Sequence, residues 1–246
     1  MEMQVANLAA FVGAAIAIGF GAIGSGWGIG YTGVGTARAM ARQPNQNSSL
    51  FRGMLIGQAV ASNPSIFALV VAVILYQMGA ASDLADADSW AKAAALLAAG
   101  ISIGLGAIGS GAGNGLIGSD AMEAISRCPS TSGKVTVMMV IAQAMGQTPV
   151  LFSLVVSLIL IVSDGDFATY ATTADQVKHA GRLLGMGICM GAGALGRGWA
   201  AASSAASSAR GWPAPRRAPW TSTRRTSSAS AFPSPPRCSP SWSPYS

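Results

Sequence analysis

The sequence predicts an all-α membrane protein of tandem transmembrane helical hairpins, with four full helices plus a fifth. Only 10% of the 246 residues are charged, whereas about 25% is usual for a soluble domain. Apolar stretches of about 20 residues, long enough to cross a bilayer, recur along the chain. In addition, the sequence IAIGFGAIG at 16–24 returns as ISIGLGAIG at 101–109 and as ICMGAGALG at 188–196. The chain is therefore expected to be a repeat protein of the membrane.

The apolar stretches predict five helices, at 7–41, 51–79, 91–125, 135–163 and 177–196. The polar segments between them alternate in charge: the first and third are basic, and the second and fourth are acidic. Because short loops rich in Lys and Arg stay in the cytoplasm, the turns with Arg42 and Arg127 are predicted to face inward. The fifth helix would then return to the cytoplasmic side.

The repeated unit is one helical hairpin. In its first two copies the correspondence runs through the turn, a glutamine, a proline and the final apolar stretch, pairing 42–44 with 127–129, Gln58 with Gln143, Pro64 with Pro149 and 66–75 with 151–160. The predicted division is a first hairpin at 1–80 and a second at 81–163. A linker and the first helix of an incomplete third hairpin follow at 164–196, and a Ser/Arg/Pro-rich tail occupies 197–246.

The tail carries the basic charge of the chain. Residues 197–246 contain seven arginines and no acidic residue, whereas residues 1–196 hold eight Lys/Arg and nine Asp/Glu. With so little apolar content the tail is expected to be disordered. It is either a genuine basic tail or the product of a frameshift after Gly196, because GC-rich DNA read out of frame gives this mixture of residues; we favour the frameshift.

Glycines recur at every second residue in the first and third helices. The set consists of Gly24, Gly26, Gly28, Gly30, Gly109, Gly111, Gly113 and Gly115. Spacings of four residues put them on two adjacent helix faces, and small residues let helices approach closely in lipid. This pattern favours a tightly packed inner layer of helices over a single dimer contact. A nucleotide-binding loop is disfavoured, since no strand precedes the glycines and no Gly-Lys-Ser/Thr follows them.

Three features together resemble a known family: the glycine-rich first helix, the Arg42-Gln43-Pro44 turn, and GQAVASNPSIFALVVAVIL at 57–75. They are similar to the rotor-ring c-subunit (proteolipid) of F-type and V-type ATPases, over about residues 10–196. Proteolipids with several hairpins are more usual on the V-type side, whereas the intact turn resembles the F-type, so the type stays open.

The resemblance implies a homo-oligomeric ring that turns in the membrane against a stator, the a-subunit. Its cytoplasmic turns would contact the central stalk, a role that falls to Arg42, Gln43, Pro44, Arg127 and Pro129. A simpler interpretation of Arg42 and Arg127 is topogenic charge and helix capping, which needs no partner.

The family's ion-binding carboxylate is missing from both full hairpins. The resemblance places it at Ser62 and Gln147, and no Asp or Glu occurs anywhere within 51–79 or 135–163. A carboxylate in a membrane is costly and normally functional, so its absence matters. Neither hairpin is expected to bind and release an ion in the way the family does.

Neutral polar groups nevertheless surround these positions. Pro64 and Pro149 cannot donate to the carbonyls of Val60 and Met145, four residues back. The polar neighbours are Gln58, Asn63, Asn114, Gln143 and Thr148, and the resemblance places Asn114 where sodium-binding members carry a polar ligand. Neutral oxygens can solvate a cation but cannot balance its charge in a low dielectric. We therefore favour hydrogen bonding between helices over ion binding.

The function expected from these features is that of a rotor subunit that couples H⁺ or Na⁺ movement to ATP synthesis or hydrolysis. It has no catalytic residues, cofactor or metal site of its own, binds no nucleic acid, and lies among the lipids of a bacterial inner membrane. If the hairpins are neutral, the ring would move fewer ions per turn than it has hairpins. The alternatives are a glycine-packed structural oligomer without transport, a V-type proteolipid that acts as part of an ion pump, and a small-solute channel built of repeats.

Overall fold

The structure, a computed structural model, describes residues 3–80, 89–162 and 173–210, and every structural statement concerns these residues. They form five long helices: α1 Met3–Arg42, α2 Asn47–Ala80, α3 Ser89–Arg127, α4 Ser132–Val162 and α5 Thr173–Arg210. One-turn 3₁₀ helices, η1 Pro44–Gln46 and η3 Pro129–Thr131, connect α1 to α2 and α3 to α4. The predicted all-helical fold of hairpins plus a fifth helix is confirmed.

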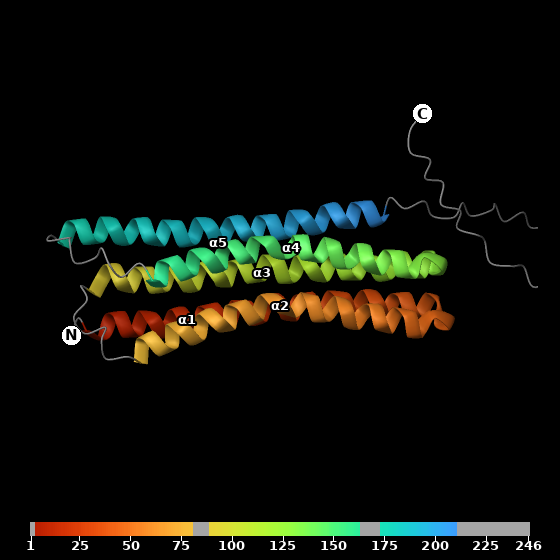
Figure 1. Cartoon of the computed structure of the whole chain (residues 1–246), viewed down its shortest axis with the longest axis horizontal. Coiled ribbons are helices and arrows are strands. Elements are labelled where there is room, and N and C mark those ends of the chain that lie inside the picture. The colour runs from red at the N-terminus through yellow and green to blue at the C-terminus, as the bar shows by residue number, and fades with distance from the viewer. Residues whose placement is uncertain (1–2, 81–88, 163–172, 211–246) are drawn as a thin grey trace, which may run out of the picture.

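Both hairpin turns lie at the same end of the molecule, and the starts of α1, α3 and α5 lie at the other (Figure 1). Each turn is built around a proline. Gln43 (φ −135°, ψ 72°) and Cys128 (φ −133°, ψ 80°) leave helical geometry, because the proline that follows each of them disfavours it. The amide of Gln43 still donates to the Ala39 carbonyl at 3.0 Å, and that of Cys128 to the Ala124 carbonyl at 3.1 Å, so the helical bonding pattern continues to the end of each helix.

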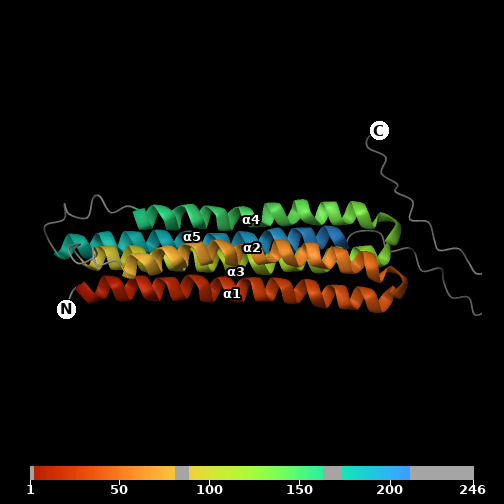
Figure 2. The same cartoon turned by 60° about the horizontal axis from the view of Figure 1, so that its bottom comes forward.

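The five helices run side by side along the long axis of the molecule (Figures 1 and 2). The most extensive contacts join α1 to α3 and α3 to α5, which makes these three a continuous glycine-rich row. Helix α2 packs against α1 and α3, and α4 packs against α3 and α5, so both form a second row. Helix α3 is the most buried, since it lies between all the others.

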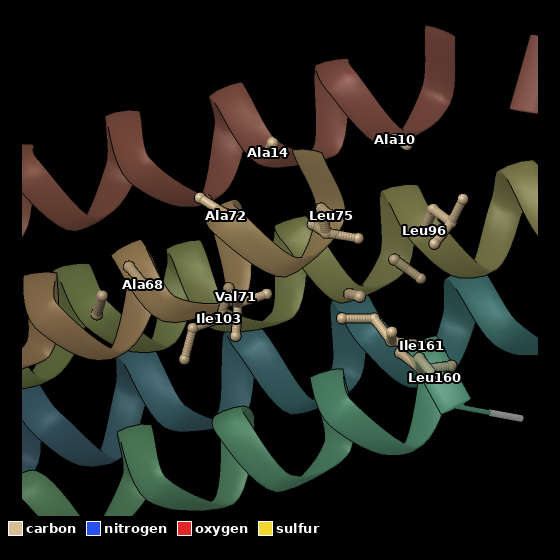
Figure 3. Close-up of a cluster of buried hydrophobic side chains, with 14 of the residues drawn as sticks. Ala10, Ala14, Ala68, Val71, Ala72, Leu75, Leu96, Ile103, Leu160 and Ile161 are labelled. Carbon is tan, nitrogen blue, oxygen red and sulfur yellow. The ribbon is translucent and has the colours of Figure 1, made fainter. Parts of the chain in front are cut away.

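The core consists largely of alanine. The main cluster joins Ala10, Ala14, Ala68, Val71, Ala72, Leu75, Leu96, Ile103, Leu160 and Ile161 with several further small residues (Figure 3). In lipid, packing depends on dispersion between closely spaced backbones, and small side chains permit that spacing. Many larger apolar side chains instead point outward: Leu69, Val73, Val155 and Ile159, for example, are all exposed, as expected for residues that face lipid.

Four of the helices are long and apolar enough to span a membrane: Val5–Arg42, Pro44–Ala80, Trp90–Arg127 and Pro129–Val162. Helix α5 is not in this set, because Lys178, Arg182 and Arg197 interrupt its apolar residues. The expected return of the fifth helix across the bilayer therefore stays a prediction.

Helix α5 also continues beyond the predicted end at Gly196, as far as Arg210. The expectation of disorder from residue 197 is thus wrong for 197–210. An alanine-rich stretch favours helix, and Gly198 continues the packing of α5 against Gly109 of α3. Residues 211–246 lie outside the described part of the chain.

Candidate functional site

The two prolines inside helices lie near Ser62 and Gln147, the positions that correspond to the family's ion-binding carboxylate. Pro64 and Pro149 are buried within α2 and α4, and both helices continue through them. Each proline lacks an N–H, so the carbonyls of Val60 and Met145 lose their usual helical donors. These carbonyls are acceptors for a side chain on a neighbouring helix.

Gln147 forms a hydrogen bond with one of these free carbonyls. Its Nε2 donates to the Val60 carbonyl across the α2–α4 contact at 3.2 Å. The side chain that replaces the carboxylate thus satisfies the acceptor that Pro64 has freed in the other hairpin. A neutral amide suits this position, because it can donate where an ionised carboxylate could only accept.

Gln143, one turn earlier on α4, bridges three helices. Its Nε2 donates to the Asn114 carbonyl of α3 at 2.9 Å and to the Gly57 carbonyl of α2 at 3.3 Å. The side chain is fully buried, and its Oε1 has no hydrogen-bond partner among the described residues. Gln143 and Gln147 together tie the second hairpin to the first.

Asn114 lies at the same level on α3 and is also fully buried. Within the described helices, neither its Oδ1 nor its Nδ2 has a hydrogen-bond partner. Its Oδ1 fits against Gly146 of α4, where an added Cβ would come within 2.5 Å of that oxygen. Two unpaired amide oxygens, from Asn114 and Gln143, are therefore buried at this level, and they are the neutral groups that could solvate a cation.

The first hairpin has a sparser arrangement. Gln58 Nε2 donates to the Ile29 carbonyl at 3.4 Å, which repeats within this hairpin the bond from Gln143 to Asn114. The Ser62 hydroxyl donates to the Ala59 carbonyl of its own helix at 2.7 Å. Asn63 is half-buried and Thr148, in the second hairpin, is exposed. The two hairpins thus differ: the glutamines of the second bond across to α2, and the polar groups of the first bond within their own hairpin.

The carboxylates of the described helices lie away from this level. Asp120 and Glu123 are near the turn end of α3, and Glu123 pairs with Arg127 at 3.3 Å. Among the described residues no group of three or more His, Cys, Asp or Glu could hold a metal ion.

The glycines of α1 and α3 differ in what they contact. Gly24 and Gly28 of α1 pack against α3, Gly111 and Gly115 of α3 pack back against α1, and Gly109 packs against α5. Gly113 is buried in α3 as well. By contrast, a Cβ at Gly26 or Gly30 would meet nothing within 4 Å. The second face of α1 is therefore open.

At the turns, Arg42 and Pro44 are exposed, while Gln43, Arg127 and Pro129 are half-buried. Arg127 is the last residue of α3 and pairs with Glu123 one turn earlier. This is the geometry of a cation at a helix C-terminus, where the helix dipole favours it. Arg42, the last residue of α1, makes no such pair in the described structure.

Sequence reasoning missed several cross-helix bonds. Thr32 Oγ1 donates to the Gly115 carbonyl at 3.3 Å, which ties α1 to α3, and Ser157 Oγ donates to the Ala99 carbonyl at 2.9 Å, which ties α4 to α3. A comparison of the hairpins could have singled out Ser157, since Ala72 is its counterpart in the first hairpin.

These features define a class: a multi-pass integral membrane protein of duplicated hairpins, with glycine-packed inner helices and a polar, proline-marked level in the outer ones. The chain belongs to the ATP synthase C-subunit family, which it matches twice, over residues 12–75 and 97–160. The two matches coincide with the two full hairpins.

Three relatives, one aligned over most of the chain and two over about one hairpin, support the same assignment. The chain is 30% identical over 199 residues to the K-subunit of the A-type ATP synthase of Methanocaldococcus jannaschii, an alignment that covers 81% of this chain and 80% of the relative. It is 50% identical over 66 residues to the ATP synthase c-subunit of Petrotoga mobilis, covering 27% of this chain and 69% of the relative. With the ATP synthase c-subunit of Prochlorococcus marinus strain AS9601 it shares 38% identity over 77 residues, which cover 31% of this chain and 95% of the relative. The chain is therefore a rotor subunit of a rotary ATP synthase, with no catalytic role of its own.

Proposed function

We propose that this rotor protein supplies two electrically neutral hairpins to the ring of a rotary ATPase. The observation that carries the proposal is the bond from Gln147 Nε2 to the Val60 carbonyl. In this bond the side chain at the position of the family's carboxylate donates a hydrogen bond that joins the two hairpins. Ser62, at the other such position, bonds to its own helix. Neither group can ionise, so neither hairpin binds and releases H⁺ or Na⁺ as the ring turns.

Fewer ion sites than hairpins lower the number of ions moved per turn. The ATP used or made per turn is set by the catalytic head, so fewer ions per ATP favours ATP-driven pumping over synthesis. If a third hairpin is encoded after Gly196, it is the place for the carboxylate. The long alignment with the A-type K-subunit, which extends beyond the two full hairpins, supports a multi-hairpin ring of this kind.

The open glycine face of α1 supports assembly into a homo-oligomeric ring. Gly26 and Gly30 correspond in the repeat to Gly111 and Gly115, which pack against the preceding helix of the inner row. In a ring, the inner helix of a neighbouring copy would take that place against α1. The turns with Arg42 and Arg127 would face the cytoplasm of a bacterial cell, with Arg42, Gln43 and Pro44 toward the central stalk and the outer helices toward the a-subunit of the stator.

Ion counting tests the proposal. The intact complex is reconstituted in vesicles, H⁺ and Na⁺ uptake per ATP hydrolysed are measured in separate arms, and the copies per ring are counted in the same preparation. We expect fewer ions per turn than hairpins. One ion or more per hairpin would refute the neutrality of the two hairpins.

A second candidate is a structural ring component that transports nothing, which the hydrogen-bonded glutamines also favour. ATP hydrolysis without uptake of either ion, in a complex that still turns, would support this candidate over the first.

A further inference from the structure

A stripe of residues on α5 occupies a position that is covered in both full hairpins. We call Cys189, Gly193 and Arg197 the outer stripe of α5. Their repeat counterparts are Ser102, Gly106 and Ser110 on α3, and Ala17, Gly21 and Ser25 on α1. Spacing of about four residues keeps each set on one helix face.

In the two full hairpins this stripe lies beneath the outer helix. A Cβ at Gly21 would come within 2.6 Å of the Ala68 Cβ of α2, and one at Gly106 within 2.5 Å of the Ser153 Oγ of α4. The serines that correspond to Arg197, Ser25 and Ser110, are both buried. The fold therefore covers this face with a helix each time it builds a complete hairpin.

On α5 the same face is open. Cys189 and Arg197 are exposed, and a Cβ at Gly193 would meet nothing within 4 Å. The open face lies beside α4, because the Arg197 guanidinium is 5.9 Å from the centre of the Phe152 ring. The surface thus continues the row that α2 and α4 form, at the next position along it.

Arg197 places a charge on this exposed surface, at the level of the middle of α3. The neighbouring Gly198 packs against Gly109, near the middle of the spanning helix α3. A cation at the centre of a membrane helix is costly, and the face of an aromatic ring offsets only part of that cost. Arg197 forms no ion pair in the described structure, and the acidic side chains of α3 lie toward the turn. A lipid phosphate at the membrane surface is also far from this depth.

We propose that the outer stripe of α5 is the docking surface for one transmembrane helix of another polypeptide. That helix brings a small residue against Gly193 and a carboxylate against Arg197. A second copy of this chain does not fit, because its outer helices α2 and α4 carry no carboxylate and are already packed in their own hairpins. The inference rests on the packing of α5 and on Arg197 as the sequence gives it, which is the genuine-tail interpretation of residues 197–246. It holds whether or not the ring transports ions.

A peptide-binding experiment in lipid vesicles tests it. The full chain carries a donor fluorophore on S130C, an exposed turn position, with its three native cysteines changed to serine. The probe is a leucine-rich transmembrane peptide of about 20 residues with one central Glu, an Ala four residues later and an acceptor dye at one end. A second peptide has Gln in place of the Glu.

We expect the Glu peptide to bind about tenfold more tightly than the Gln peptide, since a polar contact between membrane helices contributes about 1–2 kcal/mol. Arg197→Ala should abolish this preference, and Arg197→Lys should keep it. Arg182→Ala is the matched control: it removes an exposed arginine of the same helix about four turns away and should leave the preference intact. Far-UV circular dichroism establishes that each variant is folded.

Three results would overturn the proposal: equal affinity for the two peptides, a preference that survives Arg197→Ala in a folded variant, or a preference lost in folded Arg197→Lys. Energy transfer between two labelled copies of the chain that disappears in Arg197→Ala would do the same, because it would make a second copy the occupant. None of these outcomes bears on ion counting in the complex, so the two proposals fail separately.

Discussion

Two glycines, Gly24 and Gly26, lie two residues apart on α1, and they should respond to the same substitution in opposite ways. Gly24 faces α3, where an added Cβ would lie 2.5 Å from the Ala107 carbonyl oxygen and 2.6 Å from the Ile108 Cα. A Cβ at Gly26 meets nothing within 4 Å. Changing each to alanine therefore separates the packing effect from the effect on helix propensity.

The magnitude follows from these distances. Ordinary Cβ contacts begin at 3.4 Å, so α1 and α3 would have to separate by about 1 Å around Gly24→Ala. Overpacking of this kind costs about 1–3 kcal/mol, and replacing glycine by alanine in a helix returns about 1 kcal/mol. Gly24→Ala should thus lower the free energy of unfolding by up to about 2 kcal/mol, whereas Gly26→Ala should raise it by up to about 1 kcal/mol.

The assay is reversible unfolding of the monomer in mixed micelles by sodium dodecyl sulfate, followed by far-UV circular dichroism. A second readout is the size of the detergent-solubilised assembly. Gly26 corresponds to Gly111, whose Cβ would come within 2.6 Å of the Gly24 backbone, so Gly26→Ala should block the ring although it stabilises the monomer. Equal stabilities of the two variants would refute the packing argument, and an intact ring in Gly26→Ala would refute the assigned ring face.

Further predictions concern the outer helices and the tail. Gln143→Leu should lower the free energy of unfolding by about 1–3 kcal/mol, because two cross-helix hydrogen bonds are lost. Its repeat counterpart Gln58 makes one long hydrogen bond, so Gln58→Leu should lower the free energy of unfolding by less than about 1 kcal/mol. Equal losses for the two variants in a denaturant titration would contradict this prediction. Gln147→Glu should make the chain reactive toward an apolar carbodiimide, since it places a carboxyl group in α4, where residues 135–163 otherwise have none. The unmodified chain and Gln143→Leu are the controls, and labelling of either at the same rate would count against this prediction. Resequencing the gene should show a frame after Gly196 that continues into a glycine-rich helix and a second helix; a confirmed sequence would make the tail genuine.

Resequencing would also decide the docking proposal. A restored frame would replace the residue at 197 and supply a covering helix within the same chain. With Arg197 genuine, that helix has to come from another polypeptide.

The prolines and glutamines illustrate what the sequence could predict about the site. The repeat alone placed Pro64 with Pro149 and Gln58 with Gln143, and the chemistry of proline predicted that Val60 and Met145 would offer free carbonyls. It could not predict that the donor to Val60 would be Gln147, because that bond joins residues far apart in sequence across α2 and α4. The difference between the hairpins arises from that packing.

Sequence by itself determined the all-helical hairpin architecture, the position of both turns and the absence of a carboxylate from the two outer helices. These features depend on local quantities: apolar length, proline geometry and residue identity. Only the tertiary structure decided which glycine face is packed and which is open, and that α5 continues past Gly196 with its outer stripe uncovered. The reason is physical, since every helix of this chain is apolar on several sides and a helix in lipid selects its neighbours by backbone approach and shape, which no periodicity in the sequence specifies.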